Sequence, residues 1–222
     1  MREDLEQQEQ LAALKAFWAS NRKWITSTLV ILVMISVSIT GWKYYTESRQ
    51  LKASKLLSSM QVAVEEQKID DAILITNELS KKFSSYPQRG LAGLILSKAL
   101  VFDDRNEEAE KQLRDLLNFD SDVSWVARVR LAGLLLDMNK PVEALNILPE
   151  KIPPVWVGIV SDRKGDVLMA LGKKDEARIS WAKALEFYGT DRAEGVARNM
   201  IMMKLATIDS SQVVEKKSGV NQ

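Results

Sequence analysis

The chain has 222 residues, of which 46% are hydrophobic and 27% are charged, and it contains neither cysteine nor histidine. This composition excludes thiol nucleophiles, thiolate or imidazole metal sites and a histidine general base. With 31 basic against 30 acidic residues, the formal net charge is +1, which does not suggest the clustered basic surface of a nucleic-acid-binding protein.

The chain begins with a mixed-charge arm, residues 1–23, which carries four acidic and four basic residues. Leu11, Leu14 and Trp18 recur at three- and four-residue spacing, which is typical of a short amphipathic helix. Such a helix either lies along a membrane surface or docks against a partner, and the sequence leaves both open. The arm does not have the pattern of a signal peptide, because its start is acidic and mixed rather than basic.

The most apolar stretch is Trp24–Trp42, nineteen residues without a charge. A helix of that length spans about 28 Å, close to the ~30 Å hydrocarbon core of a bilayer. Only a helix satisfies every backbone amide within such a segment, so one transmembrane helix is predicted. Tryptophan rings stand at both of its ends, where lipid headgroups would lie. The residues predicted to anchor the chain are Trp24, Leu29, Ile31, Val33, Ile35, Gly41 and Trp42.

Two properties of this segment stay open. Three basic residues precede it closely and four follow it, so the positive-inside rule does not fix its orientation. Its second half, Ser36–Gly41, is rich in small and hydroxylated residues. This predicts either a contact face for another membrane helix or hydroxyl groups bonded to their own backbone.

Beyond this segment, blocks of three- and four-residue apolar spacing alternate with short polar turns, which predicts helices and no strands. Pro87, Pro141 and Pro153 mark breaks, and Gly172 and Gly189 stand where helix C-terminal glycines belong. The predicted helices are residues 46–66, 69–83, 88–102, 106–118, 123–138, 141–149, 155–171, 174–187 and 191–207.

These helices come in pairs, and the second helix of each pair begins with acidic residues followed by an alanine. The four alanines, Ala72, Ala109, Ala144 and Ala177, are separated by 37, 35 and 33 residues. A period close to 34 with two helices per unit is the signature of tetratricopeptide repeats, in which small residues let the paired helices cross closely. The residues predicted to pack the helix pairs are Ala72, Ala109, Ala132, Ala144, Gly165, Ala177, Trp181 and Ala184.

The predicted fold is therefore all-α, with a single N-terminal transmembrane helix followed by a tetratricopeptide-like helical-repeat superhelix. The domains are a short arm (1–23), the transmembrane helix (24–42), the helical-repeat domain (43–209) and a flexible tail (210–222), which has little to bury. The last helix is expected to close the stack as a cap through Val196, Met200, Met203 and Leu205.

The sequence contains few candidate sites. The acidic run Asp103–Glu108 lacks the glycine and the twelve-residue spacing of an EF-hand, so it is interpreted as helix capping. Trp125 and Trp156, near the starts of first helices, either pack in the core or line the concave surface of the superhelix. No catalytic, cofactor-binding or metal-binding constellation is predicted.

Several stretches near the ends of the chain carry a resemblance to a known family. They are an acidic arm that ends in Phe17-Trp18 and Asn21-Arg22-Lys23, a single span that ends in Gly41-Trp42-Lys43-Tyr44-Tyr45, the stretch Val157–Asp166 with Ala177-Arg178 and Trp181, and the segment Met202-Met203-Lys204-Leu205. Together with the degenerate repeat pairs, they resemble the YfgM family of bacterial inner-membrane proteins.

The resemblance implies an ancillary subunit of the SecYEG translocon, with its arm in the cytoplasm and its repeat domain in the periplasm. There it would work beside a membrane-anchored chaperone of the PpiD type and contact unfolded exported polypeptides. The family contributes no catalytic residues and no cofactor.

The leading hypothesis is a membrane-anchored adaptor that links the translocon to periplasmic chaperones and assists the folding or trafficking of exported proteins. The alternative is an envelope scaffold or a stress-signalling regulator that acts through protein–protein binding. An enzyme is not predicted, because carboxylates would have to converge in a closed pocket, whereas the acidic residues here cluster in turns.

Overall fold

The structure, a computed structural model, describes the backbone of residues 2–119, 122–188 and 192–218. Side chains are described for residues 7–119, 122–188 and 195–208. All regular elements in these ranges are helical, which confirms the predicted all-α fold. They are α1 (Arg2–Glu65), α2 (Ile69–Lys82), α3 (Pro87–Phe102), α4 (Asn106–Leu116), α5 (Asp122–Asp137), α6 (Pro141–Ile147), the 3₁₀ turn η1 (Pro154–Trp156), α7 (Val157–Ala170), α8 (Lys174–Leu185) and α9 (Arg192–Ser218).

The helix bounds differ from the predicted ones at the two ends of the chain. The predicted arm, the transmembrane segment and the predicted helix 46–66 are parts of the continuous helix α1. By its contacts the chain divides into two units, residues 1–52 and 53–222, so the last turns of α1 belong to the repeat unit. The predicted flexible tail is helical as far as Ser218, and residues 219–222, like Gly189, lie outside the described residues.

The first unit consists of the part of α1 that ends at Lys52. By length and composition, α1 is the single helix in the described part of the chain that is long and apolar enough to cross a membrane. Its anchor side chains are exposed, from 50% at Ile35 to 75% at Trp24. The hydroxyl groups of Thr28, Ser38 and Thr40 each donate a hydrogen bond to the backbone carbonyl oxygen four residues earlier, at 2.8 to 2.9 Å. Ser38 and Thr40 therefore bond to their own backbone, as the second alternative predicted, and a contact face for another membrane helix stays a prediction.

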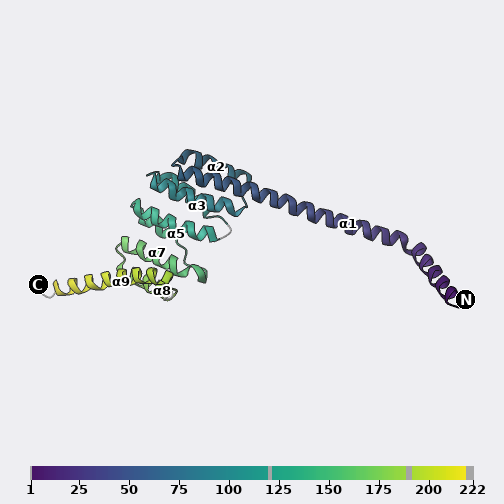
Figure 1. Ribbon diagram of the computed structural model, residues 1–222. Helices are drawn as coiled ribbons and strands as arrows, with labels where there is room; N and C mark the ends of the chain where they lie inside the picture. The colour runs from purple at the N-terminus through teal and green to yellow at the C-terminus, as the bar shows by residue number, and fades with distance from the viewer. Residues whose placement is uncertain (1, 120–121, 189–191, 219–222) are drawn as a thin grey trace. The chain divides into compact units, whose positions relative to one another are not determined.

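The second unit is a stack of helix pairs. Figure 1 shows α2, α3, α5 and α7 following one another in chain order, with α8 and α9 at the end of the stack. From α2 to α9, each helix contacts its neighbour in the chain, and α3, α5 and α7 also contact one another in succession. The core runs from Ala53 to Val167, and a second cluster around Trp181 joins α7, α8 and α9. Each pair is thus buried by its neighbours, as in other repeat proteins.

Four turns between paired helices share one backbone conformation. The residue with positive φ is Gln67 (60°), Asp104 (57°), Asn139 (58°) or Gly172 (75°). The residue after it donates its N–H to the carbonyl oxygen five positions earlier, at 2.7 to 2.9 Å, which satisfies an otherwise orphaned carbonyl at the helix end. The carbonyl oxygen of this same donor residue accepts the N–H of the repeat alanine four positions later, at 2.9 to 3.1 Å. The turn therefore fixes where the second helix begins.

Cations that follow the left-handed residue connect successive pairs. In the second turn, Arg105 Nη1 lies 2.8 Å from Asp70 Oδ1 of α2. In the third, Lys140 Nζ lies 3.0 Å from Glu110 Oε2 of α4. Arg105 also binds both carboxylate oxygens of Glu108, so part of the acidic run predicted to cap a helix forms ion pairs here.

All eight residues assigned to helix packing are buried. Gly165 shows why one of these positions is small: a Cβ atom added there would overlap the indole ring of Trp181. Met60 and Ser97, at the corresponding positions of the first two pairs, are buried as well, with 0% and 1% of their surface exposed.

Helix α9 closes the stack with a different face from the predicted one. Ile201 and Ile208 are fully buried, and Leu205 packs against the same cluster. The residues that were expected in the cap but are exposed are Val196 (61%), Met200 (53%) and Met203 (63%). The prediction for these three was wrong because α9 is apolar on both faces, so residue spacing does not select the buried one.

Substitution of Gly165 by alanine tests the close crossing in the last pair. We expect Gly165→Ala to lower the free energy of unfolding by about 1–3 kcal/mol, because the new methyl group overpacks against Trp181. Gly133→Ala is the matched control: its Cβ atom would meet only the end of the Arg163 side chain, at 3.3 Å. This control should be neutral or stabilising by up to about 1 kcal/mol, since alanine favours helix over glycine. Chemical denaturation, monitored by circular dichroism, measures the free energy of unfolding of the two variants. Equal losses in both would contradict the explanation that Gly165 is needed for the close contact with Trp181.

Candidate functional site

Three adjoining hollows, with volumes of about 470, 510 and 350 Å³, lie on the surface formed mainly by α3 and α5. The first two share Lys98, Phe102 and Arg130, and the second and third share Val64, Ala99 and Phe102. We therefore describe them as one groove. The lining residues that matter below are Val64 of α1, Leu91, Lys98 and Phe102 of α3, Arg130 and Asp137 of α5, and Arg163 of α7.

The groove is built from the first helices of successive pairs. On α3, Leu91, Ile95, Lys98 and Phe102 follow one another at three- and four-residue spacing, which places them on one face of the helix. Phe102 is the last residue of α3 and is 80% exposed, although it borders all three hollows. A phenylalanine with this exposure at the junction of hollows is the most prominent apolar contact point of the groove.

Three cations and one carboxylate line the two larger hollows. Lys98 Nζ lies 5.6 Å from the centroid of the Phe102 ring. Arg130 Nη1 donates to the carbonyl oxygen of Leu94 at 2.9 Å, so α3 holds this guanidinium in place. The guanidinium group of Arg163 lies against Gly133, where a Cβ atom added to the glycine would be 3.3 Å from Arg163 Cζ. Asp137 is the single acidic side chain that lines these two hollows.

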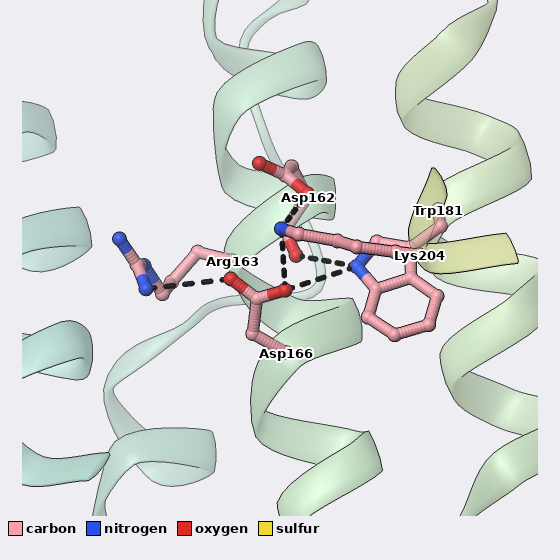
Figure 2. Close-up of polar contacts among 5 residues, drawn as sticks. All are labelled: Asp162, Arg163, Asp166, Trp181 and Lys204. Atoms are coloured by element: carbon pink, nitrogen blue, oxygen red, sulfur yellow. Dashed lines mark hydrogen bonds and ion pairs between the residues drawn. The ribbon is translucent and has the colours of Figure 1, made fainter. Parts of the chain in front are cut away.

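A second polar cluster holds α9 on α7 and α8 (Figure 2). Lys204 Nζ lies 2.7 Å from Asp162 Oδ1 and 2.6 Å from Asp166 Oδ1. Trp181 Nε1 donates to the carbonyl oxygen of Asp162 at 3.1 Å and to Asp166 Oδ1 at 3.2 Å. Arg163 Nη1 binds the other oxygen of Asp166 at 3.3 Å, so Asp166 contacts both this cluster and a residue of the groove.

Burial raises the pKa of the Asp162 carboxyl above its ordinary value, while the hydrogen bond from Lys204 acts in the opposite direction. Among the residues whose side chains are described, no group of histidine, cysteine, aspartate and glutamate is arranged to hold a metal ion. Because the cluster joins side chains of α7, α8 and α9, we interpret it as a structural contact that closes the stack.

The structure places the two tryptophans left open by the sequence outside the groove lining. The rings of Trp125 and Trp156 stack at 6.5 Å with an interplanar angle of 15°. Trp156 Nε1 donates to Asp122 Oδ1 at 3.3 Å. Both pack beside the main core, and neither borders a described hollow of the groove.

Sequence reasoning missed the groove residues Lys98, Phe102, Arg130 and Arg163. A signal was present for one of them, because Phe102 immediately precedes the polar turn Asp103-Asp104 and is the last residue of its helix. The other three are cations on apolar helices, and only the packing of α3, α5 and α7 brings them to one surface.

Comparison with known proteins matches residues 15–210 to the family described as "Tetratricopeptide repeat-like domain". Three similar proteins are each named "Ancillary SecYEG translocon subunit". The one from Neisseria gonorrhoeae is 28% identical over 92% of this chain and 98% of its own length. The one from Escherichia coli K12 is 28% identical over 78% of this chain and 84% of its own length. One from Buchnera aphidicola is 23% identical over 83% of this chain and 94% of its own length. The resemblance inferred from the sequence is confirmed.

Replacement of Lys204 tests the contact that closes the stack. In Lys204→Met, two partly buried carboxylates lose their shared cation, so we expect the free energy of unfolding at pH 7 to fall by about 1–3 kcal/mol. Lys183→Met, at an exposed position on α8, should change it by less than about 0.5 kcal/mol.

The loss should shrink as the pH falls toward 4. Because the pKa of Asp162 is raised in the folded chain, the folded state binds the proton more tightly than the unfolded state between the two pKa values. Proton uptake therefore favours the folded state in that window, and more so when Lys204 is absent. Denaturation curves at pH 7, 5.5 and 4.5 measure the difference between Lys204→Met and the parent chain. If this difference did not change with pH, the loss of stability in Lys204→Met would not come from the two carboxylates left without a cation.

Proposed function

Since the chain belongs to the tetratricopeptide repeat-like family and its relatives are named ancillary SecYEG translocon subunits, we propose that it is a membrane-anchored adaptor of the Sec translocon. The observation that carries this proposal is similarity over nearly the full length of both chains, span and repeats included. In this proposal the chain links the translocon to a membrane-anchored periplasmic chaperone of the PpiD type. It thereby assists the folding or trafficking of exported polypeptides.

Two features of the chain suit such a role. The apolar part of α1 offers exposed side chains to lipid over the whole length of the predicted span. The repeat unit supplies a broad surface of stacked helices, which serves binding rather than catalysis in many repeat proteins. Anchoring in the membrane raises the effective concentration of this surface near the translocon, so that weak docking contacts suffice.

The proposal places α1 across the inner membrane with the arm, residues 1–23, in the cytoplasm and the repeat unit in the periplasm. The nearly balanced basic residues on the two sides of the span do not decide this orientation. A long translocated domain follows its anchor with little regard to flanking charge, so the arrangement is physically compatible with the sequence.

Single-cysteine labelling tests the orientation, because the chain contains no cysteine of its own. We introduce Lys15→Cys in the arm and Glu107→Cys on α4, both at exposed positions. A membrane-impermeant maleimide should label Glu107→Cys in intact spheroplasts and Lys15→Cys only after lysis. The reverse pattern would put the repeat unit in the cytoplasm and would refute the periplasmic adaptor.

Recovery of partners from gently solubilised membranes tests the proposed role. The tagged full chain should bring down SecYEG subunits together with a membrane-anchored chaperone. A matched chain in which residues 24–42 are replaced by an unrelated transmembrane helix shows how much of that recovery depends on the native span. Recovery of other envelope proteins without the translocon would favour the scaffold or stress-signalling alternative and would contradict the proposal.

A further inference from the structure

We propose that the groove on α3 and α5 binds a polypeptide segment in which acidic side chains stand next to large apolar ones. The inference rests on the proposed function only in treating the repeat unit as a polypeptide-binding surface, and it does not require that the translocon be the partner. It names the class of ligand that this particular surface recognises.

The apolar part of the inference depends on Phe102. Phe102 is 80% exposed, and Leu91, about three turns before it on the same helix, is 46% exposed. Helix packing leaves both side chains in contact with water although they border hollows of several hundred cubic ångströms. A large apolar side chain of a ligand would fill such a hollow and cover the ring, and aromatic residues of this kind dominate the affinity of many interfaces.

The acidic part depends on the three cations. Lys98 and Arg130 line both larger hollows, and Arg163 lines the first. Within the described part of the chain, no ion pair is found for Lys98 or Arg130, whereas Arg163 is paired with Asp166. Arg130 uses one N–H for the Leu94 carbonyl and keeps further donors for a carboxylate. Asp137 is the one acidic group that lines the two larger hollows, and Asp103 lines the third. The two larger hollows, where all three cations lie, therefore complement negative rather than positive charge.

The linked hollows indicate an elongated ligand. They adjoin through shared residues and reach from Val64 on α1 to Arg163 on α7, so a ligand that filled them would cross successive helix pairs. An extended or helical peptide places side chains at such intervals while its backbone stays outside the hollows.

Peptide binding to the full chain in phosphatidylcholine nanodiscs tests the inference. The probe is a fluorescent twelve-residue peptide with two Glu-Leu pairs in a Gly-Ser background. Two comparison peptides replace either the glutamates by lysine or the leucines by serine. Fluorescence anisotropy should show binding of the probe, with both comparison peptides at least about tenfold weaker. Binding of the probe should also weaken at 500 mM salt, because part of it is electrostatic.

Matched variants locate the binding surface. Lys98→Glu and Phe102→Ser change exposed side chains of the groove, and each should lower the affinity for the probe peptide by about tenfold. Lys111→Glu on α4 and Ile179→Ser on α8, which is 70% exposed, make the same changes outside the groove and should stay within about twofold. Circular dichroism of all four confirms that the fold is retained.

Several outcomes would overturn the inference: equal affinity for all three peptides, equal effects of groove and control variants, displacement of the probe by anionic lipid, or self-association of the chain through Phe102. Its failure is distinguishable from failure of the proposed function. A chain that recovers the translocon but does not discriminate among the peptides refutes the groove inference alone. A chain that binds the acidic-apolar probe but never recovers the translocon refutes the proposed function alone.

Discussion

The turn shared by the helix pairs is the constraint on which the repeat unit depends. One left-handed residue and one backbone bond to the carbonyl five positions earlier end the first helix and reverse the chain. The next residue accepts the N–H of the repeat alanine, so the alanine always enters the second helix one turn after the reversal. Close crossing at that alanine then follows, since a larger side chain would separate the paired helices.

This arrangement decides which residues remain available for binding. The second helices pack their alanine faces against the first helices, while α3, α5 and α7 contact one another in succession. The side chains that these three leave uncovered form the groove with Phe102 at its centre. The charges of this surface are held in place: a backbone carbonyl holds Arg130, and Asp166 holds Arg163. Fixed charges lose little freedom when a ligand binds, which favours selectivity.

Much of the fold was predictable because its causes are local. Apolar spacing, the prolines and the recurring alanine set the helices and their period. From α2 to α8, the predicted bounds lie within a few residues of the observed ones. The continuity of α1 was missed because the polar residues after Trp42 looked like a boundary, although none of them breaks a helix. The buried face of α9 depends on contacts such as Lys204 with Asp162, 42 positions apart. The groove likewise requires Arg130 and Leu94 to meet across 36 positions. Periodicity within one helix carries no information about such encounters.

The ion pairs of the turns give the stack an additional property. Arg105 and Lys140 each reach back to an acidic residue of the preceding pair. Salt screens the pair of Arg105 with Asp70 most, because the Asp70 side chain is 86% exposed. The apolar contacts within each pair do not depend on salt in this way. Ionic strength therefore acts on the coupling between neighbouring pairs more than on the pairs themselves. The apolar core that the pairs share keeps the stack together when salt weakens these ionic links.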